Sequence, residues 1–346
     1  ALAASVEHLV VRVLARRFVT STGAPTPHVA DAAEWPAGEP PFYQTQRFVR
    51  DRLRQVRQEL TMQMASFSLD AKMVCVDLME VCTRFHIMVE HRCCELGLRN
   101  LPMNDVKFDS KMNMDMLTQG LSGVMSLYDD LRGHGIACDN EAEFRAYFIV
   151  SSADPEMVSG KLRQLPAHVR NAPPMQTALR ILASVQNNDP TSFFRELRKA
   201  DYLTACLMHK HIDQVRERGL QAINRALRET ELPLADLQRM LMLEHVIEAG
   251  TLVTHYGLEL TPSADAVKLK KGELRPKTEE GEDGRFRAVP LPCVCSSLIE
   301  AKRSGVPLPD LLFSPEPPAL LASDADAARR READVRRLAL EAQARR

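Results

Sequence analysis

A helical pattern that sets the fold begins at residues 47–57, Arg-Phe-Val-Arg-Asp-Arg-Leu-Arg-Gln-Val-Arg. Apolar side chains recur here at helical spacing on one stripe: Val49, Leu53, Val56 and Leu60. Arginines form the neighbouring stripe: Arg47, Arg50, Arg54 and Arg57. The pattern indicates an amphipathic helix that packs on a core. It leaves three roles open for the arginines, namely pairing with the chain's own carboxylates, binding an acidic partner, or binding RNA phosphate.

The same spacing recurs along most of the chain. It predicts helices over residues 5–20, 70–97, 112–132, 155–165, 174–187, 191–199 and 202–228, with a further helix opening at Asn140. Residues 21–41 are rich in proline and predict a linker or a long surface loop. Helices joined by short connections, without a fixed-period sequence repeat, predict a mainly α fold. We expect an irregular helical-repeat (TPR-like) α-solenoid.

The pattern changes after about residue 230. Two shorter helices, at roughly 234–243 and 244–257, precede a Lys-rich stretch, an acidic turn and an extended piece at 285–289. Short helices followed by a hairpin are the order of a winged helix. We therefore expect an N-terminal helix with a Pro-rich linker (1–41), a helical-repeat region (42–230), a winged-helix domain (231–312) and an Ala/Arg-rich tail (313–346).

Composition indicates an ordinary soluble globular protein. Of 346 residues, 45% are hydrophobic and 26% are charged, and the formal net charge is -1, so global charge favours no class of partner. The eight cysteines follow no disulfide framework, which predicts a reducing compartment. The sequence holds no apolar run of 18 residues, so we expect no membrane-spanning helix. Its first residues also lack the features of a signal peptide.

Candidate metal ligands cluster once, and the spacing favours core packing. Residues five apart on a helix point to different faces, and adjacent cysteines diverge further, so these four cannot form a tetrahedral site: His86, His91, Cys93 and Cys94. His209 and His211 are two apart on a helix and do not face each other. Cys293 and Cys295 could lie on one strand face, but no second pair completes a zinc site. We expect no metal and no cofactor.

Catalytic motifs are also missing from the sequence. It has no phosphate-binding glycine loop, no zinc-protease motif and no nucleophile elbow. Two carboxylate pairs lack a nucleophile or histidine at a recognisable spacing, which favours helix capping and ion pairing: Asp129 with Asp130, and Glu141 with Glu143. We assign no catalytic residue and expect a protein that is not an enzyme.

An ordered set of segments spans about residues 42–312. The segments are Phe48–Gln63, Cys82–Ile87, Tyr128–Arg132, Asn140–Tyr147, Val169–Asn171 and Tyr202–His209. In this order they resemble one family, the GANP-type mRNA-export scaffold proteins (SAC/GANP, PCI-associated). The resemblance covers the middle module of that family only.

The resemblance implies a function and a set of partners. The winged helix is then of the PCI type, and the chain is a non-enzymatic scaffold subunit of a TREX-2-like complex that couples transcription to mRNA processing and nuclear mRNA export. The implied partners are a second PCI-domain protein, a small acidic DSS-type protein, and RNA or single-stranded nucleic acid. The implied location is the nucleus, at nuclear pores, with no membrane contact.

An alternative stays open. The chain is then a PCI-type protein-interaction subunit without RNA binding, located at the centrosome or spindle, or in the cytoplasm in a signalosome-like or proteasome-lid-like assembly. The sequence lacks the family's Cys-Pro-rich motif, its Phe-Gly repeats, its centrin-binding helix and its acetyltransferase domain. We therefore do not expect centrin binding, and a centrosome-associated or splicing-linked paralogue remains open.

Two candidate sites follow. Five cations occur within ten residues: Lys268, Lys270, Lys271, Arg275 and Lys277. They predict a wing or inter-helix loop that binds the phosphate backbone of a nucleic acid without reading its bases. A solvated loop is the competing interpretation, because the acidic run that follows could fold back on these cations. Apolar residues near the end of the winged helix predict the face that docks a PCI partner: Val294, Leu298 and Ile299.

Overall fold

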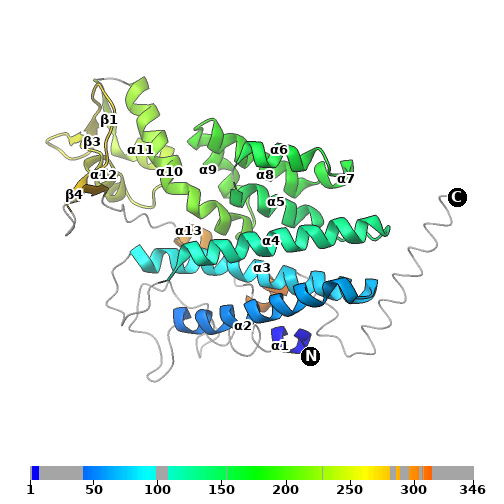
Figure 1. Ribbon diagram of the computed structural model, residues 1–346. Helices are drawn as coiled ribbons and strands as arrows, with labels where there is room; N and C mark the ends of the chain where they lie inside the picture. The colour runs from blue at the N-terminus through cyan, green and yellow to red at the C-terminus, as the bar shows by residue number, and fades with distance from the viewer. Residues whose placement is uncertain are drawn as a thin grey trace. The chain divides into compact units, whose positions relative to one another are not determined.

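The computed structural model describes residues 2–7, 42–98, 108–152, 154–227, 229–280, 286–288, 296–303, 306 and 308–313. Within these residues the fold is mainly helical, as the sequence predicts (Figure 1). Cα proximity groups the chain into two compact units. The first comprises residues 1–89, 111–138 and 304–346, and the second comprises residues 90–110 and 139–303.

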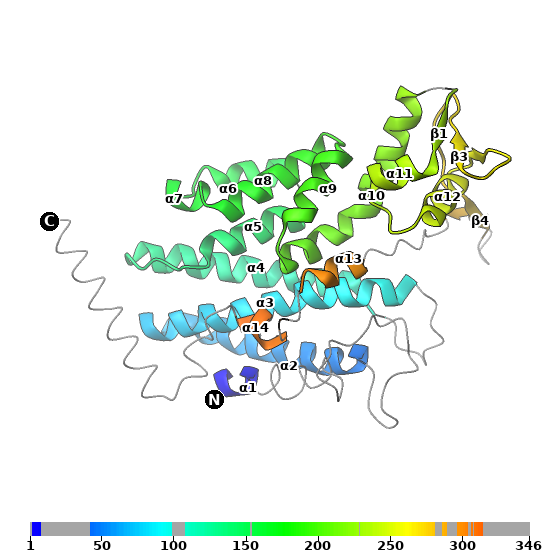
Figure 2. The same cartoon turned by 180° about the vertical axis from the view of Figure 1, so that it is seen from behind.

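The described part of the first unit consists of helices α1 (Leu2–Glu7), α2 (Phe42–Gln63), α3 (Leu69–Leu98, as far as Val89), α4 (Ser110–Gly133, from Lys111) and α14 (Leu308–Phe313). A short 3-10 turn, η4 (Met64–Ser66), follows α2. The apolar stripe of α2 is buried, which confirms its prediction. Figure 2 shows α14 beside α3, where the buried Arg84 donates from Nη1 to the Leu312 carbonyl at 3.2 Å.

Helix α3 is a central helix, because its residues 80–90 are buried on every side. Its buried polar side chains carry their own partners. Glu80 accepts a hydrogen bond from the Tyr128 hydroxyl at 2.6 Å and pairs with Arg84 at 3.5 Å. Burial raises the pKa of Tyr128 well above its usual range, and the neighbouring Glu80 raises it further, so the hydroxyl keeps the proton that it donates.

The second unit continues as helices α5 (Glu141–Ser152), α6 (Pro155–Leu162), α7 (Ala167–Arg170), α8 (Pro173–Gln186), α9 (Pro190–Lys199), α10 (Tyr202–Ala226) and α13 (Ser296–Ala301). Local chemistry fixes where several begin. Proline stands in the first turn of α6, α8 and α9, where no backbone N–H is needed. The side chains of Asp154, Asp189 and Asp201 accept backbone N–H groups at their helix starts. Helix α8 packs against α5 and α9 (Figure 1).

A strand-bearing module, residues 229–277, follows α10 in the same unit. It holds β1 (Glu231–Pro233), α11 (Leu234–Leu241), α12 (Val246–His255), β2 (Glu259–Leu260) and β3 (Ala266–Lys268). The three strands form an antiparallel sheet in the order β1-β3-β2. Leu220 and Ile223 of α10 are part of its apolar core, so the module packs directly on α10. A second ribbon pairs β4 (Thr278–Glu280) with β5 (Phe286–Ala288).

Most predicted helices begin and end within three residues of their expected bounds. Several short helices and strands were not predicted. The sequence did not predict α7 or the strands β1–β3, and the extended piece at 285–289 corresponds to β5. The helix expected over 5–20 is described only as α1, and the linker 21–41 and nearly all of the tail 313–346 lie outside the described residues. The domain boundaries stay predictions, although the second unit runs across residue 230 because α10 shares the module's core.

Among the helices that the structure describes, none combines the length and the apolar composition needed to cross a membrane.

Candidate nucleic-acid interface and partner-binding segment

The basic segment, residues 268–277, is held against the module by two apolar side chains. Lys268 is the last residue of the central strand β3, so the segment begins on the sheet and continues beyond it. The segment therefore follows β3 and is not the loop that connects β2 to β3. Leu269 and Leu274 are buried in the module's core. The predicted cations between and beside them project outward, and all five are exposed.

Asn224 of α10 fixes the backbone of this segment. Its side-chain oxygen accepts the Lys270 backbone N–H at 3.0 Å, and its side-chain nitrogen donates to the Gly272 carbonyl at 3.3 Å. Gly272 has φ +112°, a conformation that glycine adopts without a steric cost. Because the Lys277 backbone N–H also donates to the His255 carbonyl at 2.8 Å, the segment is tethered at both ends.

Two glutamates flank Lys268 on the sheet. In the strand register Lys268 lies opposite Glu231 of β1 on one side and Glu259 of β2 on the other. Residues directly opposite each other project from the same face, so one exposed cation stands between two exposed carboxylates. The sequence pattern does not indicate these neighbours of Lys268, because the register of two- and three-residue strands cannot be read from periodicity.

Two further cations of the basic segment have partners. Lys270 donates from Nζ to the Gly257 carbonyl at 2.7 Å, and Lys271 pairs with Glu229 at 3.3 Å, an exposed pair. The five cations and Glu273 give the segment a formal charge of +4, which Glu229, Glu231 and Glu259 reduce to +1. Arg275 and Lys277 are the two cations of the segment that none of these contacts engages.

The predicted partner-binding residues lie on or near α13. Val294 lies outside the described residues, Leu298 is half-buried, and Ile299 is fully buried. Docking through Ile299 therefore requires α13 to move, whereas Leu298 is accessible where it stands.

A buried polar cluster centred on Glu300 secures α13 to the rest of the second unit. The carboxylate accepts a hydrogen bond from Tyr202 of α10 at 2.9 Å, lies 3.1 Å from His91 Nε2, and pairs with Arg92 at 3.3 Å. His91 also contacts His209 of α10 through their Nδ1 atoms at 2.9 Å. Two residues on, Lys302 donates from Nζ to the Arg198 and Ala200 carbonyls, each at 2.9 Å, at the end of α9.

The cluster keeps Glu300 ionised. Burial alone opposes the charged form, but the hydrogen bond from His91 and the charge of Arg92 outweigh it and lower the pKa of Glu300 to about 2. No sequence pattern indicates this cluster, because His91 and Glu300 are 209 positions apart. From the sequence, His91 was expected to pack in the core, and His209 was considered only together with His211.

The metal candidates whose side chains the structure describes pack within the units, whereas Cys293 and Cys295 lie outside the described residues. His86 contacts Asn113 at 2.8 Å, His211 donates to the Val150 carbonyl at 2.8 Å, and Cys93 is fully buried. Burial lowers the pKa of His86 and of His211 to about 4 each. The described residues contain no group of His, Cys, Asp and Glu arranged to hold a metal ion.

The arginine stripe of α2 divides into two rows. Arg50 and Arg57 are buried: Arg50 pairs with Asp51 at 3.0 Å, and Arg57 donates to Gln119 at 2.9 Å. Arg47 and Arg54 are exposed on the other row. Pairing with the chain's own carboxylates, one of the three interpretations, therefore holds for Arg50, whereas Arg57 is held by the Gln119 amide.

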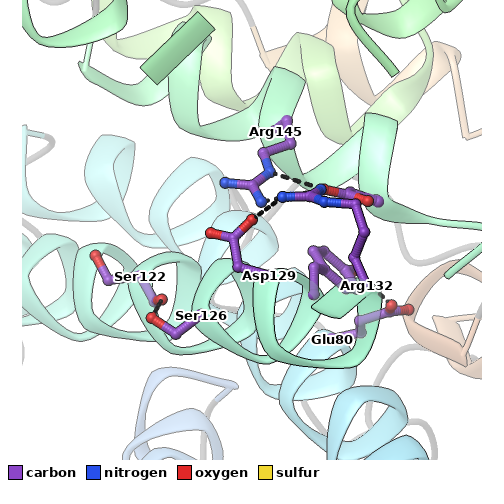
Figure 3. Close-up of polar contacts among 8 residues, drawn as sticks. Glu80, Ser122, Ser126, Asp129, Arg132 and Arg145 are labelled. Atoms are coloured by element: carbon purple, nitrogen blue, oxygen red, sulfur yellow. Dashed lines mark hydrogen bonds and ion pairs between the residues drawn. The ribbon is translucent and has the colours of Figure 1, made fainter. Parts of the chain in front are cut away.

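The acidic pairs are engaged in ion pairs and hydrogen bonds. In Figure 3 Asp129 pairs with Arg132 on α4. Asp130 pairs with Lys72 at 2.6 Å. On α5, Glu141 pairs with Arg145 at 3.0 Å, and Glu143 accepts the Tyr147 hydroxyl at 2.7 Å. These contacts confirm the ion pairing that was expected for these carboxylates.

Comparison with known proteins identifies relatives along most of the chain. Residues 28–262 match the model of the SAC3/GANP family. The chain is 32% identical to Protein xmas of Drosophila melanogaster over 228 residues, which is 64% of this chain and 10% of that protein. It is 32% identical to SAC3 family protein 1 of Schizosaccharomyces pombe over 247 residues, 65% of this chain and 23% of that protein. SAC3 family protein B of Arabidopsis thaliana is 29% identical over 223 residues, 62% of this chain and 13% of that protein. The matched region thus spans less than a quarter of each of these relatives.

Proposed function

The chain belongs to the SAC3/GANP family, and from this membership we propose that it is a non-enzymatic scaffold subunit that acts in nuclear mRNA export within a TREX-2-like complex. The observation that carries the proposal is the length of the match. Residues 28–262 include the helices from α2 to α12 and both edge strands of the module, β1 and β2. The likeness therefore extends over a continuous series of elements and does not rest on a single motif.

In this proposal the strand-bearing module is a PCI-type winged helix, and the helices before it form an irregular solenoid. The order strand, helix, helix, strand, strand, with β3 between β1 and β2, supports the winged-helix interpretation. Winged helices of this kind pair with a second PCI-domain protein, and a small acidic DSS-type protein binds both. Leu298 is the accessible apolar side chain that we place at this contact.

Nucleic-acid binding by the basic segment is a separate element of the proposal. Arg275 and Lys277 are exposed cations of that segment that the glutamates around Lys268 and Lys271 do not engage, so they are its candidate phosphate contacts. The glutamates around Lys268 favour the alternative function, a PCI-type protein-interaction subunit without RNA binding at the centrosome or in a cytoplasmic assembly.

Affinity purification of the tagged 346-residue chain from nuclear extract, followed by mass spectrometry, tests the scaffold role. The export role predicts a PCI-domain protein and a small acidic protein in stoichiometric amounts. A Leu298→Arg variant should lose the PCI-domain protein, while Leu227→Arg, a matched change at an exposed leucine of the same unit, should retain it. Recovery of proteasome-lid, signalosome or centrosomal subunits instead would support the alternative.

A further inference from the structure

Residues 157–199 carry an excess of basic side chains. This run is described throughout and contains two acidic residues, Asp189 and Glu196. Its basic residues are Lys161, Arg163, Arg170, Arg180, Arg195, Arg198 and Lys199. Seven cations and two carboxylates give a formal charge of +5 in a chain whose net charge is -1. We propose that the exposed face of α9, with Arg180 of α8 beside it, binds the phosphates of single-stranded nucleic acid.

Both carboxylates of this run are already used by the fold. Asp189 is the N-cap of α9 and accepts the Ser192 backbone N–H at 3.0 Å, and hydrogen bonds from Ser192 hold its pKa below the usual range. The Glu196 side chain is only 4% exposed and accepts Arg180 Nε at 3.0 Å, while Arg195 Nε lies 4.0 Å away. Asp189 is therefore occupied at the helix start, and Glu196 offsets part of the charge of Arg180 and Arg195. Arg198 and Lys199 are the cations of α9 for which the described structure gives no contact with either carboxylate.

Helix α9 separates its apolar and basic residues onto opposite faces. Phe193, Phe194 and Leu197 are buried, whereas a basic stripe faces outward: Arg195, Arg198 and Lys199. Residues three and four apart on a helix are neighbours, with roughly 5–6 Å between their Cβ atoms. The α9 basic stripe is therefore contiguous, and the contact between Glu196 and Arg180 places a fourth cation next to it.

Helix stability does not account for the stripe. Cations in the last turn stabilise a helix by interacting with its dipole and its unpaired carbonyls. At α9 that role is taken by Lys302, whose Nζ donates to the Arg198 and Ala200 carbonyls. Arg195 and Arg180 lie before the last turn. The outward-facing cations are thus in excess of what the helix end needs.

The surroundings favour phosphate over an acidic protein segment. Protein partners usually bind through apolar or aromatic anchors in addition to charge. In the described structure, α8 and α9 contain no exposed large apolar residue, and both phenylalanines of α9 are buried. Without exposed aromatic rings on which bases could stack, the surface contacts the backbone of the strand and does not read its sequence.

This inference goes beyond the proposed scaffold role, because it concerns another surface of the chain and requires no partner protein. The test is fluorescence anisotropy of the full-length chain with a fluorescein-labelled oligouridylate of about 20 nucleotides, measured from about 50 to about 200 mM KCl. Each phosphate contact to a single strand contributes about 0.7 to the slope of log affinity against log salt. Replacing Arg195, Arg198 and Lys199 by Gln should weaken binding and make the slope shallower by roughly 2.

Two variants and one further probe make the test decisive. R198Q/K199Q leaves the Arg180–Glu196 pair and Arg195 in place and should still reduce the salt slope, even if the triple variant folds poorly.

R47Q/R52Q/R54Q is the control for the triple variant. It removes three charges from exposed arginines of α2 and should bind as the wild type does. An unchanged slope in R198Q/K199Q, or an equal loss in the α2 control, would overturn the proposal. Tighter binding of a labelled polyglutamate peptide of similar length, lost in the same variants, would assign the surface to an acidic protein instead.

Discussion

The α9 basic stripe and the basic segment 268–277 are both rich in cations, but their surroundings are opposite. In the basic segment, glutamates and a carbonyl lie against Lys268, Lys270 and Lys271. In residues 157–199 the two carboxylates serve as a helix cap and in a buried ion pair. The comparison teaches that a cluster of cations in a sequence indicates a binding surface only where the chain's own carboxylates and carbonyls leave those cations available.

Removing Glu300 should destabilise the surroundings of α9 and have the largest effect of the changes considered. The Glu300 cluster holds the segment that carries Lys302, and Lys302 donates to the carbonyls at the end of α9. Glu300→Ala leaves His91 and Arg92 without their shared carboxylate. Loss of one partner from a buried ion pair costs about 3–5 kcal/mol. The measurement is the free energy of unfolding in urea, with Glu59→Ala at an exposed position as the control. A loss below about 1 kcal/mol would mean that the cluster does not support α9.

Acid should also weaken the fold around the two buried histidines. The pKa of His86 and of His211 is lowered to about 4 by burial, so between about pH 6.5 and pH 4 the unfolded chain binds protons that the folded chain does not. Stability therefore falls as pH falls through this range, by about 3 kcal/mol for each histidine. Urea unfolding at several pH values should show this slope, and His211→Gln should reduce it.

The control for this pH dependence is His168→Gln, at an exposed histidine of α7. It should leave the slope as it is in the wild type. Below about pH 4.5 a second loss begins, because the lowered pKa of Glu300 stabilises the fold only while the carboxylate stays ionised. A flat stability profile between about pH 6.5 and pH 4 would contradict the burial of these two histidines.

Asn224→Ala should act on the basic segment alone. It removes the hydrogen bonds to the Lys270 N–H and the Gly272 carbonyl, and an unpaired buried polar group costs about 1–3 kcal/mol. Hydrogen exchange should quicken across residues 268–277 while α9 keeps its protection. Gln214→Ala, a change at an exposed position of the same helix, is the control. Equal loosening of both regions would show that they are not independent.

The smallest expected effect is a gain in oligouridylate affinity when the glutamates beside Lys268 are removed. E231Q/E259Q removes the two carboxylates opposite that lysine in the register. Exposed pairs are worth up to about 1 kcal/mol, so affinity for the oligouridylate should rise by about fivefold at most, with a steeper salt slope. E59Q/D70N removes the same charge at exposed positions of the first unit. If both variants gain equally, the register does not mask Lys268.

Sequence reasoning was reliable where periodicity carries the information. The long helices α2, α3, α4, α8 and α10 follow from apolar spacing, with prolines and aspartates at several of their starts. It missed β1–β3, because strands of two or three residues are too short to show alternation. It identified the five cations of the basic segment but could not predict their neutralisation, which depends on strand register and on α10.

The candidate site shows the same limit. The contact between His91 and His209 joins residues 118 positions apart, and no local pattern in either helix points to the other. The α9 basic stripe, in contrast, is visible in the sequence as Arg195, Arg198 and Lys199, but its meaning depends on knowing that Glu196 is buried. Local order was predictable, and the pairing of charges was not.

Lysine footprinting tests the difference between the two regions most directly. The full-length chain is acetylated briefly with and without the oligouridylate, and mass spectrometry reads Lys199 together with Lys268, Lys270, Lys271 and Lys277 in one sample. The account predicts that the oligonucleotide slows acetylation of Lys199 by a larger factor than that of Lys268. Protection of the segment lysines, with Lys199 modified at its original rate, would contradict it.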